Sequence, residues 1–217
     1  MKRRMLLLAA GLVSGLALSA PASAQMWFFP DYAVPSAAGA PSTWIAGTYG
    51  RGLNDASGEI DGFGLVAGRS GESVSFLGGI GQGREGGDSE TTLGAAVAYD
   101  FAKGESLNVA VQGGIGWFSS ESFDAFRFPV GVAFKGSVQN QTATITPWAM
   151  PRLNITRLSF DGESETETDL GASGGVSFTF PGGFGIHTAL DILFANEEEP
   201  ITFGIGGHYV LGGGGGN

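Results

Sequence analysis

A strict alternation of apolar residues with small or polar ones constrains this chain more than any other feature of its sequence. The segment 107–117, which reads LNVAVQGGIGW, is typical. Successive side chains of a β-strand point to opposite faces of the sheet, so an alternation of period two indicates a strand with one apolar face. The predicted apolar face carries Leu107, Val109, Val111, Ile115 and Trp117, and the opposite face carries Asn108, Ala110 and Gln112.

Two architectures produce this alternation. In a transmembrane barrel the apolar face contacts lipid and the polar face lines the lumen, whereas in a soluble β-sandwich or lipocalin-like barrel the apolar face packs inward. The second face of these segments consists largely of Gly, Ala, Ser and Thr and lacks the Lys and Glu expected of a water-exposed surface. The pattern therefore favours the membrane barrel and keeps a secreted, soluble binding protein as an alternative.

The N-terminus predicts export. Lys2, Arg3 and Arg4 precede an apolar run, and residues 22–24 (Ala-Ser-Ala) form a small-residue cleavage site. Residues 1–24 are therefore predicted to be a secretory signal peptide. The apolar run is shorter than the roughly 20 residues that a membrane-spanning helix needs. The chain has no cysteine, so neither a disulfide framework nor a thiolate metal site is predicted.

The charge of the mature chain excludes one class of partner. Cleavage leaves 8 basic residues against 21 acidic ones, a net charge of −13. Such a balance argues against binding to nucleic acid, which requires basic surfaces. Glycine is abundant, at 39 residues. Glycine contributes no side chain to a soluble core, but it fits the narrow interior and the bends of a closed barrel.

The mature chain is predicted to have three parts: an arm over residues 25–42, a β-barrel over 43–211 and a glycine-rich tail over 212–217. The arm is rich in Pro and Ala and contains the aromatic residues Trp27 and Tyr32. Its prolines disfavour a regular strand or helix. A periplasmic linker, an aromatic plug and an anchor at the membrane interface all remain open for it. The tail is predicted to carry no fold information.

The barrel segment is predicted to be all-β, an antiparallel up-and-down transmembrane β-barrel. The alternation and the turn residues between the segments indicate about ten strands, with eight as the alternative. The predicted strands cover residues 43–53, 61–69, 73–82, 91–101, 106–118, 126–135, 143–158, 169–180, 184–194 and 200–211.

Alternate connections between these strands differ in charge. The hairpins that follow odd-numbered strands hold 16 of the 21 acidic residues, whereas the intervening turns hold almost none. An up-and-down sheet with an even number of strands places all such hairpins at one end and both termini at the other. With the termini in the periplasm, the acidic end faces outside. The 16 residues are Asp55, Glu59, Asp61, Glu85, Asp88, Glu90, Glu121, Asp124, Asp161, Glu163, Glu165, Glu167, Asp169, Glu197, Glu198 and Glu199.

Aromatic residues near the strand ends support a lipid-facing surface. Transmembrane barrels carry aromatic girdles at both membrane interfaces. The residues predicted to form such girdles are Trp44, Trp117, Phe118, Phe126, Phe128, Phe180, Phe184, Phe194 and Tyr209.

These features together resemble the small Gram-negative outer-membrane β-barrels of the opacity-type and OmpA-like class. The segment 146–155, which reads TPWAMPRLNI, resembles a strand common in that class, with Trp148 in its aromatic position. The chain departs from the class in having ten predicted strands where small members usually have eight, and in ending with a glycine tail where members usually end with Phe. The resemblance implies a monomer in the outer membrane, with outer-membrane lipids and the barrel assembly machinery as partners.

Six charged or ionisable residues have the parity of the lumen face. Charges at this depth must pair with each other or contact water. A proton relay, a selectivity ring and a structural salt-bridge network that fills a narrow barrel are the alternatives. A hairpin in which Phe194 pairs with Ile201 also predicts that His187 pairs with His208. Asp100 and Lys135 lie at a similar distance from the periplasmic end and are expected to pair nearby. The predicted lumen network consists of Asp100, Lys135, Arg152, His187, Asp191 and His208.

Catalysis is not predicted. Some ten-stranded outer-membrane barrels are proteases with Asp and His at the extracellular rim, but both histidines here fall near the opposite ends of their strands. One Gly-x-Ser-x-Gly match occurs, at residues 171–175 (GASGG), but it lies inside a predicted strand and not at the strand-to-helix turn of a nucleophile elbow. The acidic segment 161–169 lacks the glycine-centred pattern of a calcium loop. We therefore predict no cofactor and no metal site.

The predicted function is a structural or surface-interaction barrel with a filled lumen. A small passive channel and a soluble binding protein are the alternatives.

Overall fold

The computed structural model describes residues 41–57, 61–85, 88–119, 124–160, 163–195 and 199–211. The predicted signal peptide, all but the end of the predicted arm and the glycine-rich tail lie outside these ranges. Within them no helix is long and apolar enough to cross a membrane.

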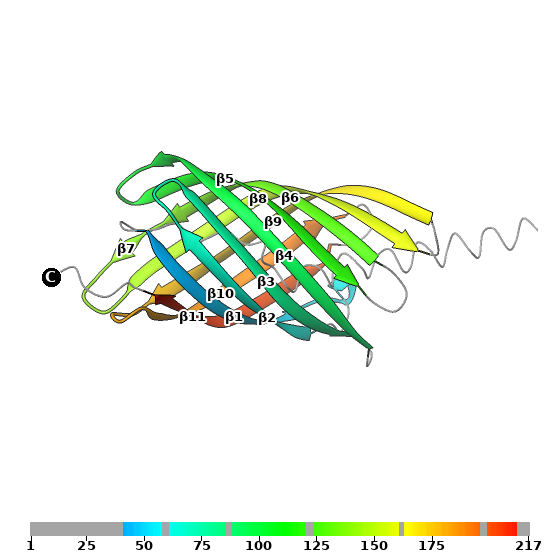
Figure 1. Ribbon diagram of the computed structural model, residues 1–217, viewed down its shortest axis with the longest axis horizontal. Helices are drawn as coiled ribbons and strands as arrows, with labels where there is room; N and C mark the ends of the chain where they lie inside the picture. Colours follow the sequence, from blue (N-terminus) through cyan, green and yellow to red (C-terminus); the bar gives the residue numbers. More distant parts are fainter. Residues whose placement is uncertain are drawn as a thin grey trace, which may run out of the picture.

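Ten long strands make up the described part of the chain, together with the two-residue strand β7 (Val138–Gln139) and the short 3-10 helix η1 (Asp55–Ser57). Figure 1 shows the long strands running obliquely around one wall. They are β1 (Ser42–Gly52), β2 (Asp61–Ser70), β3 (Val74–Glu85), β4 (Asp88–Lys103), β5 (Leu107–Ser119), β6 (Asp124–Gly136), β8 (Thr144–Phe160), β9 (Glu163–Thr179), β10 (Phe184–Phe194) and β11 (Ile201–Leu211).

The wall closes on itself. Each long strand is antiparallel to its neighbours, β1 pairs with β11, and β6 pairs with β8 past the short β7. This confirms the predicted all-β, up-and-down barrel of ten strands over the eight-strand alternative. We call the end where β1 begins and β11 ends the terminal end, and the opposite end the acidic end.

The outer face of the wall is apolar, whereas the inner face combines polar and small residues with a cluster of buried apolar side chains. On β5, Val111 points outward and is 43% exposed, whereas its neighbour Ala110 is fully buried in the interior. Leu107 and Ile115 are exposed and Gln112 is buried, as the alternation predicts. A lipocalin-like binding protein would show the reverse arrangement, so the described part of the wall contradicts that alternative.

The acidic residues predicted to cluster do so where the structure describes them. The connections β1–β2, β3–β4, β5–β6, β8–β9 and β10–β11 all lie at the acidic end. Eleven of the 16 predicted residues are described, and all eleven belong to this end: Asp55, Asp61, Glu85, Asp88, Glu90, Asp124, Glu163, Glu165, Glu167, Asp169 and Glu199. The other five, Glu59, Glu121, Asp161, Glu197 and Glu198, lie outside the described residues.

Strand β9 differs most from its predicted bounds. It begins at Glu163, whereas the sequence predicts a start at Asp169 after an acidic loop. The prediction is wrong because it treated polar residues as loop residues. Glu alternates with Ser and Thr through 163–168, and a hairpin can extend into solvent through backbone pairing with β8 alone.

The register between β10 and β11 is shifted by two residues from the predicted one. Ile201 pairs with Ile192, not with Phe194. Asn54, from the connection between β1 and β2, fixes the start of β11. Its Nδ2 donates to the carbonyl of Glu199 (2.7 Å), and its Oδ1 accepts from the N–H of Ile201 (3.1 Å). This contact between distant loops has no signature in the hairpin sequence itself.

Candidate functional site inside the barrel

Two deeply buried charges form an ion pair between β8 and β10. Arg152 Nη2 lies 2.8 Å from both carboxylate oxygens of Asp191, and Arg152 Nε donates to Asn154 Oδ1 at 3.1 Å. Arg152 is 3% exposed, and the other two residues are 0% exposed. Water does not reach this group, which we call the arginine cluster. It ties together two strands that are not neighbours.

A glycine on the intervening strand makes this contact fit. Gly171 is the residue of β9 that faces the arginine cluster. A Cβ at this position would lie 2.9 Å from Asn154 Nδ2 and 3.2 Å from Arg152 Cζ. The guanidinium therefore crosses β9 where a side chain is missing. The arrangement is a packed structural contact, because both charged groups are desolvated and paired.

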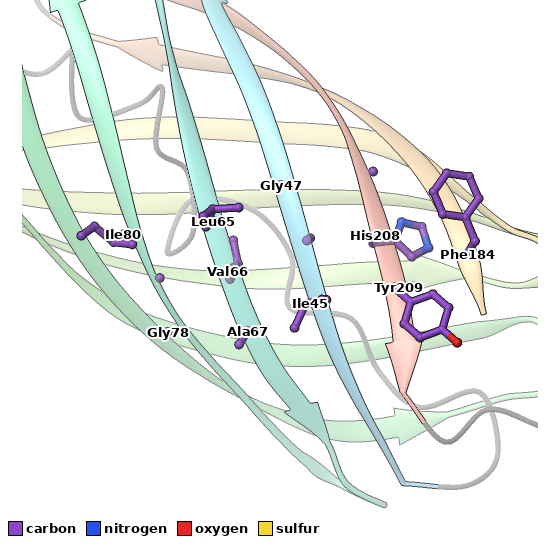
Figure 2. A pocket seen from close by; sticks show the side chains of 13 residues that line it. Ile45, Gly47, Leu65, Val66, Ala67, Gly78, Ile80, Phe184, His208 and Tyr209 are labelled. Atoms are coloured by element: carbon purple, nitrogen blue, oxygen red, sulfur yellow. The ribbon is translucent and has the colours of Figure 1, made fainter. Parts of the chain in front are cut away.

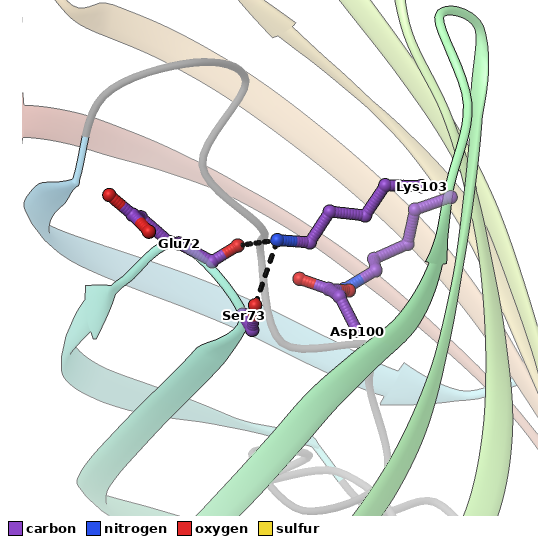
Figure 3. A network of polar contacts seen from close by, with 5 residues as sticks. Glu72, Ser73, Asp100 and Lys103 are labelled. Atoms are coloured by element: carbon purple, nitrogen blue, oxygen red, sulfur yellow. Dashed lines mark hydrogen bonds and ion pairs between the residues drawn. The ribbon is translucent and has the colours of Figure 1, made fainter.

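A second ion pair joins β4 to β6 across β5, nearer the terminal end. Lys135 Nζ lies 2.7 Å from Asp100 Oδ1, and both side chains are 3% exposed. Close to it, Lys103 at the end of β4 donates to Ser73 Oγ (2.9 Å) and to the backbone carbonyl of Glu72 (Figure 3). These contacts hold the end of β4 against the turn between β2 and β3.

The two histidines are close neighbours inside the barrel but not a directly opposed pair. Their ring centroids are 5.8 Å apart and their planes are tilted by 31°. In the ladder, His187 pairs with Gly206 and His208 pairs with Gly185, so the predicted direct pairing is wrong and the rings are diagonal neighbours. Each ring lies over its glycine partner. A Cβ at Gly206 would lie 2.6 Å from His187 Nε2.

Hydroxyl groups bind both imidazoles. Thr48 Oγ1 and His187 Nε2 are joined by a 2.8 Å hydrogen bond, and Thr179 Oγ1 and His208 Nε2 by another of the same length. Both histidines are half-buried. In the described part of the chain, no group of three or more His, Asp or Glu side chains is placed to hold a metal ion. The side chains that hydrogen-bond to the two imidazoles carry hydroxyl groups, whereas acid–base catalysis by His normally uses a carboxylate partner.

The interior also holds aromatic side chains that their positions near strand ends predict for the outer girdles. Trp44 is 6% exposed and Phe118 is 1% exposed, so both assignments are wrong. The Trp44 ring lies over Gly68, where a Cβ would lie 2.6 Å from Trp44 Cε2. The period-two alternation of a strand predicts both inward positions. Trp44 is an even number of residues from the inward Thr48, and only one of the adjacent residues Trp117 and Phe118 can face outward.

Charges of both signs line the mouth at the acidic end. Arg127 is buried on β6, with its Nε 3.5 Å from Thr156 Oγ1. Glu167 lies beyond the last exposed apolar residue of β9. Partial burial raises the pKa of the Glu167 carboxyl, and the negative charges of Asp169 and Glu165 raise it further. Carboxylates thus crowd the β9 side of this mouth.

An apolar groove of about 590 Å³ lies on the outer wall over the neighbouring strands β1, β2, β3, β10 and β11 (Figure 2). Gly47, Ala67 and Gly78 contribute outward-facing positions with little or no side chain, while Leu65 and Ile80 stand beside them. The groove belongs to the apolar outer surface and brings no cluster of polar groups together.

Comparison with known proteins identifies the fold. The β domain of the Bordetella autotransporter BrkA is 13% identical, with a TM-score of 0.51, over 79% of this chain and 100% of that chain. The fold is that of an outer-membrane β-barrel. The translocator domain of the autotransporter NalP from Neisseria meningitidis is 12% identical, with a TM-score of 0.46, over 93% of this chain and 96% of that one.

The N-terminal β-barrel domain of Pseudomonas aeruginosa OprF is also similar. It is 16% identical, with a TM-score of 0.37, over 78% of this chain and 97% of that chain. No family profile matches the sequence, and no curated protein matches it. At these identities the similarity concerns the fold alone.

Proposed function

We propose that this chain is an outer-membrane protein whose barrel is packed rather than water-filled, and whose role is structural or surface interaction. The single observation that supports the location best is the distribution of large apolar side chains. Exposed Ile, Leu, Val and Phe residues occur on the outer face of all ten long strands. A water-exposed surface of that kind would be strongly unfavourable, and lipid is the solvent that suits it.

The packed interior supports a role without conductance. The arginine cluster and the ion pair of Lys135 with Asp100 occupy the lumen face with almost no exposure to water. In this proposal the six predicted lumen residues form a structural network, and outer-membrane lipids and the barrel assembly machinery are the partners of a monomer. The proposed role is also non-enzymatic, because His187 and His208 lie toward the terminal end, away from the acidic mouth.

Two measurements test this proposal. The native protein is expected in the outer-membrane fraction, with a gel mobility that changes on heating, as folded barrels show. Recovery in the soluble periplasmic fraction would overturn the location.

The purified barrel in planar lipid bilayers is expected to give no stable current steps. Regular single-channel steps would overturn the packed lumen and support the small passive channel instead.

A further inference from the structure

The hairpin of β8 and β9 has an unpaired edge. Strand β9 pairs with β8 as far as Glu163, but it pairs with β10 only from Leu170 onward. Among the residues that the structure describes, no strand pairs with the other edge of residues 163–169. This stretch spans roughly 23 Å at the rise of a β-strand. Figure 1 shows the hairpin, in yellow, reaching out at the acidic end.

Backbone groups point away from the hairpin along this edge. Phe180 donates its N–H to the carbonyl of Phe184, which places the backbone groups of Phe180 on the β10 side. These directions alternate along an antiparallel strand. The even-numbered residues Ser164, Thr166 and Thr168 therefore present their N–H and C=O groups at the unpaired edge. An edge of this kind is a template for an added strand.

The side chains along the edge select the partner by charge. Glu163, Glu165, Glu167 and Asp169 follow one another at every second position, so they share one face of the strand. An extended segment with Lys or Arg at every second position matches this spacing, because cross-strand pairs of opposite charge are favourable. A second copy of this chain does not match, because two such edges would bring carboxylates together.

We propose that residues 163–169 bind an extended, basic segment of a partner protein by β-strand addition. The backbone groups of the even-numbered residues supply the ladder, and the four carboxylates supply the selectivity. This inference deepens the surface-interaction role proposed above and rests on it for the exposure of the acidic end to the outside.

Binding is tested with purified barrel in nanodiscs of zwitterionic lipid and a fluorescent peptide of sequence KTKVKTK with blocked ends. The matched control peptide is ETEVETE. Saturable binding of the basic peptide only is expected, with slower hydrogen exchange at the amides of Ser164, Thr166 and Thr168. If neither peptide binds, the carboxylates only guard the edge against pairing, and the inference is overturned.

The variant Thr166→Pro separates strand addition from simple charge attraction. It removes one N–H of the unpaired edge, leaves the ladder to β8 intact and changes no charge; proline is tolerated at such edge positions. Binding is expected to weaken at least tenfold while the heat-dependent gel mobility stays that of the native barrel. Unchanged binding would overturn strand addition.

The charge contribution is tested with the double variant Glu163→Gln, Glu165→Gln. Its matched control is Glu72→Gln, Glu105→Gln, which removes two exposed carboxylates at the terminal end. The first pair is expected to weaken binding about fivefold, at the usual size of exposed ion pairs, and the second to leave it unchanged. Equal weakening would overturn the assignment to this edge. All these outcomes are independent of membrane fractionation and conductance, which test the proposed function.

Discussion

The two faces of the same wall obey opposite rules. On the outer face of β6, Phe134 and Val130 are exposed, whereas on its inner face Lys135 and Arg127 are buried. Soluble proteins bury apolar side chains and leave lysine and arginine in water. This reversal indicates that lipid is the solvent that suits the outer face. The interior depends on paired charges, hydrogen bonds and side chains that pack against glycines.

The largest expected effect comes from breaking the arginine cluster. Asp191→Ala leaves the Arg152 guanidinium desolvated without a counter-charge, so the barrel is expected to lose about 3–5 kcal/mol of unfolding free energy. Urea unfolding in lipid vesicles, followed by gel mobility, measures the loss.

A double variant distinguishes the cost of an unpaired buried charge from the cost of lost packing volume. Arg152→Met with Asp191→Leu removes both charges and keeps apolar volume, and it is expected to recover most of the stability. A double variant as unstable as Asp191→Ala would show that the unpaired charge is not the cause.

A charge on the outer face gives the next largest effect. Val111 lies near the middle of the apolar stretch of β5, so Val111→Arg is expected to cost about 2–4 kcal/mol in a bilayer. The control is Ala110→Ser on the inner face, which adds one small hydroxyl beside Ala133 and is expected to cost much less than the arginine. Equal, small losses for both variants in the same unfolding assay would argue against lipid contact.

Glycines sharpen the same comparison on a smaller scale. Gly206 lies under the His187 ring and against the carbonyl of Gly47, so Gly206→Ala is expected to cost about 1–3 kcal/mol through overpacking. Gly113 faces outward, and a Cβ there meets nothing within 4 Å. Gly113→Ala is therefore expected to be neutral or slightly stabilising. A similar cost at both positions would contradict the packed interior.

The smallest expected effect concerns the pKa of Glu167, which lies beyond the apolar part of β9 at the acidic end. A raised pKa means that the folded barrel binds the Glu167 proton more tightly than the unfolded chain does. Ionisation then destabilises the fold as the pH rises above the ordinary value of 4.5, and acidification through this window removes the penalty. Carbon-detected NMR of the carboxyl group should place its midpoint above 4.5. A midpoint below that value would contradict the effects of partial burial and of the neighbouring carboxylates on the Glu167 pKa.

Much of the fold follows from local pattern. Period-two alternation predicts which residues of β5 face outward, and the alternating charge of the connections predicts ten strands and an acidic end. Both signals work because each depends on residues close in sequence. The start of β9 does not follow from the same pattern, because alternating polar residues predict a loop as readily as a strand.

The interior was predicted less well. The parity of the strand positions predicts that Asp100, Lys135, Arg152 and Asp191 lie on the lumen face. It does not predict their ion-pair partners, because each pair joins two strands that are separated by a third strand. The diagonal arrangement of His187 and His208 follows from the register of β10 with β11. Asn54, more than a hundred positions away, binds the start of β11, and sequence spacing carries no trace of that contact.

The central claim, that the outer face contacts lipid while the inner face is packed, is tested most directly by brominated lipids. Variants that retain only one tryptophan, either Trp117 on the outer face or Trp44 in the interior, are reconstituted in bilayers with bromine on the acyl chains. Bromine quenches tryptophan only at short range. The structure predicts strong quenching of Trp117 and little of Trp44, and equal quenching or the reverse order would contradict it.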